Sequence, residues 1–516
     1  MRLPHAALLL VCFAGLAVAK PTLSSKEFGD LKKQAQKAAA KGEHGELRGA
    51  IEGLGKDDSQ RAAELIASIA AHVPEAYTAG VAAVAGMSSD EAWDEIVGTL
   101  KKSGGAAEVK IFYVDVCAAK GDDRGSDGMA AALSAWKKQP SVARAALDGI
   151  KKKKLVKAVD GLIDLLAELE SAKETDGLLY TQVREVLLAI TGEQFEKAVD
   201  WRNYWEPRKA SFRPVTGPAK QLAGSTGERK KPTFFGSELK SNRLVFVIDV
   251  SGSMMEADPP STGGAPPPPT AGPTGGPGGQ GGSGAGAGGG GGLGGPAGAG
   301  AGGGADESRV RIERAKKQLA GVLGQLPPDA KFAVFAYNGI MMQGPNGVSL
   351  PPGAPTDPKE PLPPKMGGWE WLSVWKEPRL QPATEKNKAD AAEWVGQLKA
   401  NGATFTFNAL KNAFQVEGAD TIVLLSDGAP TEFDREKGTQ MTTDRILEEV
   451  AELNRFKRLR IDTFGFDPEA PGMGAGGARG GSRGGAGPGL GGMGGSLSEF
   501  LRKLAEQNGG AYKRID

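Results

Sequence analysis

The chain has 516 residues, more than one ordinary domain contains, so we expect two or three domains. Its 63 Lys and Arg residues balance 62 Asp and Glu residues, and the formal net charge of +1 argues against a protein that binds nucleic acid through its whole surface. The only histidines are His5, His44 and His72, so a histidine-centred catalytic or metal site is close to excluded.

The amino terminus has the pattern of a secretory signal. Arg2 precedes an apolar run at residues 6–18, and the small residues of Ala17-Val18-Ala19 suit a signal peptidase. The run is shorter than the roughly 20 residues that span a bilayer, and no later segment is long and apolar enough to do so. We therefore expect residues 1–19 to be removed and the mature protein to be exported, to the periplasm or the cell surface. Lipidation at Cys12 and an uncleaved anchor are the less favoured alternatives.

Residues 25–212 contain Ala- and Leu-rich amphipathic stretches of helical length, separated by short breaks, and show no strand-like alternation. This pattern predicts an all-helical domain. Because paired amphipathic helices bury their apolar stripes only against neighbouring pairs, the pattern favours an α-solenoid. The two clearest stripes consist of Leu155, Val159, Leu162, Leu166 and Leu169, and of Leu179, Val183, Val186, Leu187 and Ile190.

The end of this helical domain carries a family resemblance. The segment at residues 186–195, which contains Ile190-Thr191-Gly192 and is followed by Trp201 and Trp205, resembles the closing repeats of bacterial HEAT-repeat proteins. The resemblance implies a HEAT-like solenoid that acts as a non-catalytic scaffold or protein-binding surface, and a plain helical bundle is the alternative. We expect both tryptophans to pack in a core rather than to form a ligand cage.

A basic linker with Gly and Pro, at residues 213–240, separates the helical domain from a second domain at residues 241–516. The second domain opens with a continuous apolar run at residues 244–248. Such a run is typical of a parallel strand that is buried on both faces.

Five side chains whose oxygen atoms could bind a metal lie just after strands or in tight loops of this second domain. Asp249, Ser251 and Ser253 come directly after the first strand, Thr404 lies in an Asn-Gly-Ala-Thr loop, and Asp427 comes just after a second apolar run. In an open parallel sheet, ligands collect beyond the carboxyl ends of the strands where the strand order reverses, so these side chains are placed to converge. Carboxylate and hydroxyl oxygens suit Mg²⁺, Mn²⁺ or Ca²⁺ rather than zinc.

The segments Asp249-Val250-Ser251-Gly252-Ser253, Gly402-Ala403-Thr404 and Ser426-Asp427-Gly428 together resemble a von Willebrand factor type A (VWA) domain with a complete metal-ion-dependent adhesion site. The resemblance covers residues 241–516 and implies an α/β doubly wound, mostly parallel sheet. It implies hydroxyl ligands at Ser251, Ser253 and Thr404, and an ion held by Asp249 and Asp427 directly or through water. Mg²⁺ is the expected ion, and a carboxylate from a protein partner completes its octahedron.

The other periodic segments of the second domain fit the same fold. The pattern predicts helices at residues 307–326, 389–398 and 497–507, and strands at residues 332–337, 372–375, 421–425, 460–466 and 511–515.

Three irregular segments depart from a plain VWA pattern. The Gly- and Pro-rich tracts at residues 259–305 and 471–496 are expected to be disordered inserts. After a Pro-rich stretch, Trp369, Trp371 and Trp375 are expected to pack at a sheet edge, with an aromatic contact patch as the alternative.

These observations predict an exported, non-enzymatic binding or adhesion protein. In this prediction a divalent metal captures an acidic side chain of a protein partner, and the helical domain acts as a scaffold. No nucleotide cofactor is expected, because the Gly-rich tracts lack phosphate-binding spacing. The alternative is a structural envelope component with a static or vacant metal site. A metal-dependent hydrolase is less favoured, since the two serines have no general-base partner in the sequence.

Overall fold

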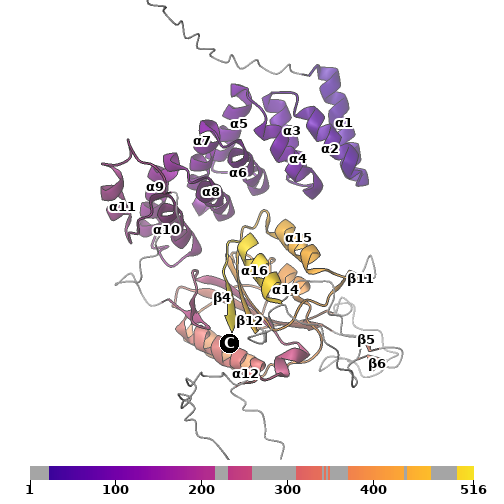
Figure 1. The fold of residues 1–516 in the computed structure, drawn as a ribbon, viewed down its shortest axis with the longest axis vertical. Helices are drawn as coiled ribbons and strands as arrows, with labels where there is room; N and C mark the ends of the chain where they lie inside the picture. The colour runs from indigo at the N-terminus through magenta and orange to yellow at the C-terminus, as the bar shows by residue number, and fades with distance from the viewer. Residues whose placement is uncertain are drawn as a thin grey trace, which may run out of the picture.

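The computed structural model describes residues 23–215, 231–258, 309–339, 342–343, 347–348, 370–434, 439–466 and 497–515. These residues form a helical array and an α/β unit (Figure 1). The predicted signal peptide, both predicted inserts and Trp369 lie outside the described residues. Within the described ranges, none of the helices combines the length and the hydrophobicity of a membrane-spanning segment.

The helices of the array have clear local start and stop signals. Ser24 accepts the N–H of Glu27 at 3.3 Å while the Glu27 carboxylate accepts the N–H of Ser24 at 2.9 Å, which forms a capping box. Gly42, Gly121 and Gly192 end three helices in the left-handed conformation. The helices are α1 (Ser25–Lys41), α2 (His44–Leu54), α3 (Gln60–Ala70), α4 (Pro74–Ala85), α5 (Asp90–Lys101), α6 (Ala107–Lys120), α7 (Asp123–Ala132), η1 (Leu133–Lys137), α8 (Pro140–Lys153), η2 (Val156–Ala158), α9 (Val159–Ser171), α10 (Leu178–Thr191) and α11 (Ala198–Trp205).

The array stacks in two rows of helices. Helices α2, α4, α6, α8 and α10 pack successively on one another, and α3, α5 and α7 form a second row against them. This stacking order is the one that a solenoid of helix pairs requires, and the HEAT-like assignment stays a prediction. The predicted core position of two tryptophans is confirmed, because Trp201 and Trp205 are buried and the Trp201 ring packs edge-on against Phe195 with 5.0 Å between ring centroids. One predicted stripe residue, Leu155, lies in the connection before α9 rather than on the helix.

The α/β unit is built on one mixed, mostly parallel sheet. The strands lie in the order β13, β12, β9, β3, β4, β7, and β8 also pairs with β4. All neighbours are parallel except β7 and β8, which run antiparallel to β4. The strands are β3 (Arg243–Asp249), β4 (Lys331–Gly339), β7 (Glu370–Val374), β8 (Gln381–Pro382), β9 (Thr421–Ser426), β12 (Arg460–Phe466) and β13 (Tyr512–Ile515).

Helices cover both faces of this sheet, as a doubly wound fold requires. Phe246 of β3 packs in a cluster with α12 (Arg311–Gln325) and α13 (Glu385–Gly396). Val245 and Val247 point to the opposite face and pack with α14 (Thr406–Ala413), α15 (Thr443–Asn454) and α16 (Leu497–Gln507). Because both faces of the sheet are buried, the central strands contain continuous runs of apolar residues, and this is why they could be predicted from the sequence.

The second domain starts earlier than predicted. The short hairpin of β1 (Thr233–Phe234) and β2 (Ser237–Glu238) lies inside the predicted linker, yet Phe234 is fully buried in the core of the α/β unit. Its ring packs edge-on against Phe464 of β12, with 4.9 Å between ring centroids. Residues 233–240 therefore belong with the α/β unit rather than with the linker. The predicted sheet-edge packing of Trp375 is confirmed, since its ring stacks on Phe332 at 5.1 Å.

The helical array contacts the amino ends of the strands. The loop at residues 455–458, which leads from α15 into β12, lies against α4, α6 and α8. Buried Arg144 donates to the carbonyls of Lys457 at 2.9 Å and Arg458 at 3.0 Å. Arg458 pairs with Asp115 at 2.6 Å, and Phe456 packs edge-on against Tyr77. Close to the start of β3, Lys240 and Arg243 pair with Glu185 and Glu174.

Loss of the Arg458–Asp115 pair is expected to loosen the contact between the two regions. In a double-mutant cycle with Arg458→Met and Asp115→Asn, we expect a coupling of about 1 to 2 kcal/mol in the free energy of unfolding, because the pair is mostly buried. Chemical denaturation of the full-length protein measures this coupling. As a matched control, the exposed pair of Arg445 and Glu449 on α15 should couple by less than about 0.5 kcal/mol. Equal coupling in the two cycles would contradict a specific role for Arg458.

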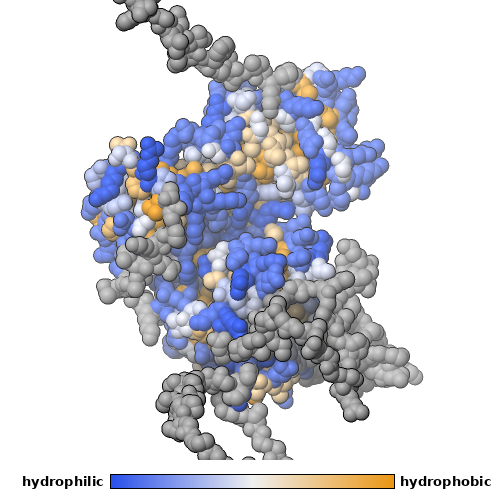
Figure 2. Space-filling model, in the orientation of Figure 1, coloured by the Kyte–Doolittle hydropathy of each residue, from blue (hydrophilic) through white to orange (hydrophobic). Residues whose placement is uncertain are grey.

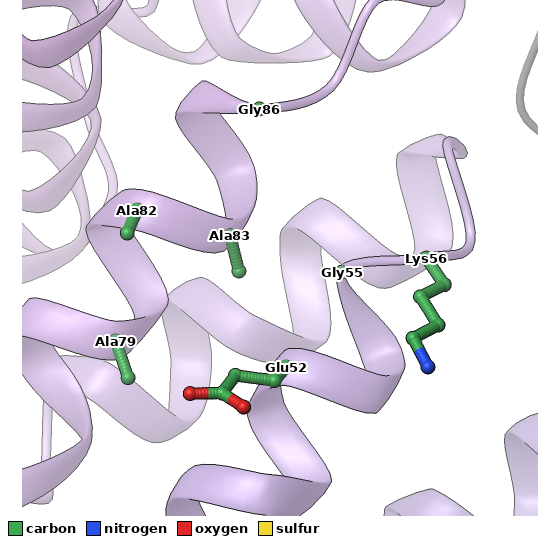
Figure 3. Close-up of a pocket in the computed structure, with 7 residues that line it drawn as sticks. All are labelled: Glu52, Gly55, Lys56, Ala79, Ala82, Ala83 and Gly86. Atoms are coloured by element: carbon green, nitrogen blue, oxygen red, sulfur yellow. The ribbon is translucent and has the colours of Figure 1, made fainter.

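The surface in view is mainly hydrophilic. Figure 2 shows one gathering of apolar residues, over α3 and α4 of the array. The structure places a hollow of about 300 Å³ in this part of the array, between α2 and α4 (Figure 3). Its lining is small and mostly aliphatic, without a nucleophile beside a base, so it has no catalytic arrangement. The lining residues are Glu52, Gly55, Lys56, Ala79, Ala82, Ala83 and Gly86.

Candidate metal centre

The five predicted site residues lie at the carboxyl edge of the sheet, around the ends of β3 and β9. These two strands are neighbours, with Ile248 opposite Leu425. Along the chain, β3 connects to β4 on one side, while β9 lies on its other side, so the strand order reverses at this point. A doubly wound sheet forms its ligand crevice at such a reversal, which is where the sequence placed the site.

Asp249 ends β3 and is fully buried. One carboxylate oxygen accepts the N–H of Ser251 at 2.8 Å, and the other accepts the Ser426 hydroxyl at 2.7 Å and the Tyr337 hydroxyl at 3.4 Å. The carboxylate is therefore held in one orientation by groups from the two neighbouring strands, β4 and β9, and from the loop that follows β3.

The two serines and Asp427 are in direct contact with one another. Ser251 is extended, and its Oγ lies 3.1 Å from the Oγ of Ser253 in the next turn. Ser253 donates to Oδ1 of Asp427 at 2.7 Å. The Asp-x-Ser-x-Ser segment and the end of β9 thus meet, although 174 positions separate Ser253 from Asp427.

The loop that carries Thr404 is clamped against the same edge. Gly252 donates to the carbonyl of Gly402 at 2.8 Å, and Gly339 and Ala403 exchange two backbone hydrogen bonds. A Cβ atom on Gly428 would lie 2.9 Å from Oγ1 of Thr404 and 3.6 Å from Oγ of Ser253. These distances place the hydroxyls of Thr404 and Ser253 near the same point beside Gly428, so Thr404 joins the group formed by the other four predicted side chains.

The two carboxyl groups of the site repel each other in a dry environment. Burial raises the pKa of Asp249 to about 7, and the nearby charge of Asp427 adds to the rise. Burial also raises the pKa of Asp427, while hydrogen bonds from Ser253 and Arg311 oppose that rise. A cation placed between the two groups would relieve this repulsion.

Arg311, the first residue of α12, is not among the site residues predicted from the sequence. Its side chain is 4% exposed, and its guanidinium lies 3.0 Å from Oδ2 of Asp427, 3.0 Å from Asp258 and 3.1 Å from Glu256. The arginines near residue 311 read as the polar face of a helix. Their partners lie on the far side of a long Gly-rich tract, so spacing in the chain gave no signal.

Two residues that follow Asp427 were also missed, and both brace the threonine loop. The hydroxyl of Thr431 accepts the N–H of Thr404 at 3.2 Å, and the N–H of Thr431 donates to the Thr404 carbonyl at 2.8 Å. Buried Glu432 accepts the N–H groups of Phe407 and Asn408 at the start of α14. These contacts fix the Thr404 hydroxyl through the backbone.

The oxygen atoms of the five predicted side chains suit a hard divalent cation that can be held by few carboxylates. Two buried carboxyl groups and three hydroxyls converge, and oxygen donors of this kind suit Mg²⁺ or Mn²⁺ with water in the remaining positions. Across the described part of the chain, no group of three or more His, Cys, Asp or Glu side chains could hold a metal ion. A metal at this edge would therefore depend on the hydroxyls of Ser251, Ser253 and Thr404.

Comparison with known proteins gives little further guidance. No protein-family model matches the chain, and no curated protein matches it. Among solved structures, the chain is similar to "von Willebrand factor type A from Catenulispora acidiphila", with a TM-score of 0.26 and 18% identity. The similarity covers 53% of this chain and 38% of that one, so it spans well under half of that protein's length. This likeness is too weak to assign a function to the α/β unit.

Proposed function

We propose that the α/β unit is a VWA domain whose adhesion site binds a divalent cation, with Mg²⁺ the first choice, and through it an acidic side chain of a protein partner. The observation that carries this proposal is the convergence of Asp249, Ser251, Ser253, Thr404 and Asp427 at the reversal of strand order. The protein would be exported and non-enzymatic, with the helical array as a HEAT-like scaffold.

Each side chain has a distinct role in this proposal. The hydroxyls of Ser251, Ser253 and Thr404 would be direct ligands, and Asp249 and Asp427 would hold the ion directly or through water. A bound octahedral cation supplies an exchangeable position that a partner's carboxylate can occupy. The hydrogen bonds to Asp249 from Ser251 and Ser426 keep that carboxylate oriented before any ion arrives.

The orientation of the two regions supports binding of an external partner. The array holds the amino ends of the strands through Arg144 and Glu185, whereas the candidate site lies at the carboxyl ends. In Figure 1 the array lies next to α15 and α16, and the chain's last strand ends on the side of the sheet away from it. The contacts of the array therefore lie at the end of the sheet opposite the proposed metal edge.

Two alternatives use the same site differently. In a structural envelope component the ion only braces the fold, and in a hydrolase it activates water. Hydrolysis is less favoured, because all three histidines of the chain precede residue 73, and Asp427, the carboxylate that accepts the Ser253 hydroxyl, is itself one of the groups that would hold the ion.

Capture of acidic ligands by immobilised full-length protein tests the proposal. We expect wild type to retain acidic protein ligands in Mg²⁺ or Mn²⁺ and to release them in chelator, and Asp249→Ala to retain none. Turnover of a substrate that Asp249→Ala loses would favour the hydrolase. A variant that loses only thermal stability would favour the structural component.

Ion binding is expected to weaken as the pH falls below about 7. The raised pKa of Asp249 means that the metal-free site holds a proton there, and the ion has to displace it. The apparent affinity for Mn²⁺ should then fall about tenfold per pH unit below about pH 7. Titration of the full-length protein with Mn²⁺, followed by electron paramagnetic resonance from about pH 5.5 to 8, measures this slope.

The metal-free protein should show the opposite trend in stability. Because the folded pKa of Asp249 lies above its unfolded value of 3.8, the native state binds more protons, and stability falls as the pH rises through the window from 3.8 to about 7. The stabilisation by an ion should therefore grow over this window. An affinity that is constant between about pH 5.5 and 7.5 would show that no buried carboxyl competes with the ion.

A further inference from the structure

Arginine side chains near the proposed metal edge offset much of the negative charge of its carboxylates. Besides Asp249 and Asp427, the carboxylates of Glu256 and Asp258 lie around Arg311. Arg314 pairs with Asp258, and Arg309 donates to the carbonyl of Asp258. The resulting cluster of four carboxylates and three guanidinium groups joins the end of the Asp-x-Ser-x-Ser loop to the start of α12.

Backbone contacts hold this cluster in place. Ala257 and Val310 form an antiparallel bridge, and the N–H of Asp258 donates to the carbonyl of Arg309 at 3.0 Å. The N–H of Arg311 donates to the carbonyl of Glu256 at 3.0 Å. The guanidinium of Arg311 is thereby fixed next to Asp427 by the fold and not by a flexible surface contact.

The net charge of the cluster decides which ligands a bound ion can accept. Four carboxylates and three guanidinium groups carry a formal net charge of −1, which a divalent ion changes to +1. Without the three arginines, the loaded edge would keep a charge of −2 and would repel a second carboxylate. Arg311 matters most, because its guanidinium lies 3.0 Å from Asp427 and its burial protects its field from screening by salt.

We propose that Arg311 is the specificity-determining residue of the metal edge: its charge offsets the site's own carboxylates, so that the bound ion can accept an anionic ligand. This inference rests on the proposed metal site and deepens it. It assigns to Arg311 a role in ligand binding that is separate from ion binding, since a guanidinium does not attract the ion.

Two titrations of the full-length protein separate these effects: Mn²⁺ alone, and glutarate added to the Mn²⁺-loaded protein, both followed by the relaxation of Mn²⁺-bound water. For Arg311→Gln we expect an affinity for Mn²⁺ equal to or tighter than wild type, and an affinity for glutarate at least about tenfold weaker. Arg311→Lys restores the charge and should restore glutarate binding to within about threefold. The matched control is Arg314→Gln, which removes the same charge from a residue that pairs with Asp258 and should have a smaller effect.

A second variant, Glu256→Gln, tests the same effect of charge in the opposite direction, and it carries little risk to folding because the side chain is exposed. The Glu256 side chain is 65% exposed, and Glu256→Gln removes a negative charge near the same edge, so glutarate should bind about threefold more tightly. Loss of Mn²⁺ binding in both Arg311 variants would overturn the inference and make Arg311 a residue that only orients Asp427. Unchanged glutarate binding in Arg311→Gln and Glu256→Gln would also overturn it. If wild type binds no Mn²⁺, the proposed function itself fails, and this inference with it.

Discussion

Asp249→Ala is expected to abolish the stabilisation of the α/β unit by divalent ions. In wild type, an ion at about a hundredfold excess over its Kd stabilises the native state by about 2.7 kcal/mol. For a domain of this size, that corresponds to a rise in Tm of about 5 to 10 °C. Alanine removes a fully buried carboxylate from the proposed site and the acceptor for Ser251 and Ser426. Thermal unfolding of the full-length protein in chelator, and then in Mg²⁺, Mn²⁺ or Ca²⁺, measures the shift.

The control for this experiment is Asp444→Ala. Asp444 is a highly exposed carboxylate in the first turn of α15, so its removal should leave the full shift in Tm. A shift that persists in Asp249→Ala would place the ion elsewhere. The absence of a shift in wild type with all three ions would remove the metal proposal and would leave a scaffold whose binding surface has to be sought on the helical array.

Gly402→Ala is expected to destabilise the protein by about 3 kcal/mol or more and to weaken ion binding. Gly402 has a φ of +74°, and a Cβ atom there would lie 2.2 Å from the carbonyl oxygen of Gly339. Gly339 and Ala403 exchange the hydrogen bonds that hold the Thr404 loop against the sheet. Relief of the overlap therefore has to move the loop and its hydroxyl. Urea-induced unfolding and Mn²⁺ titration measure the two effects.

Gly418→Ala is the control that separates the two reasons for glycine at position 402, the close contact with Gly339 and the left-handed backbone conformation. Gly418 has almost the same φ, +75°, but the nearest atom to a Cβ there is a Leu380 methyl carbon at 3.9 Å. The substitution should cost about 1 kcal/mol, the price of the left-handed conformation alone, and should leave Mn²⁺ affinity unchanged. Equal losses of stability in the two variants would show that contact with Gly339 is not the reason for glycine at position 402.

Much of the α/β unit could be predicted from short stretches of sequence. Strands β3, β4 and β9 are buried on both faces, so they contain continuous apolar runs of strand length. The polar residues that end β3 and β9 stand out against these runs. Because the carboxyl ends of parallel strands share one edge, these residues could be expected to converge, and the pairing of β3 with β9 brings Ser253 to Asp427.

The boundary near residue 233 could not be predicted in the same way. Phe234 and Phe235 are flanked by Lys, Pro and Gly, which read locally as a linker. Only the docking of the hairpin on the sheet shows why aromatic residues stand there, since both rings pack against Phe464. Two-residue strands have no periodicity from which to infer them.

The sequence by itself was sufficient to predict a helical region, a parallel sheet and the five oxygen-bearing side chains at its edge. Helical periodicity, apolar runs and the residues that end strands are all local properties of the sequence. Tertiary structure was needed to show that Arg311 lies against Asp427, that Thr431 and Glu432 brace the threonine loop, and that Arg458 docks into the helical array. Each of these is a contact between segments that are distant in the chain or joined through backbone geometry. Charged side chains on helices and loops have the same local pattern whether they face solvent or a buried partner, and only packing distinguishes the two.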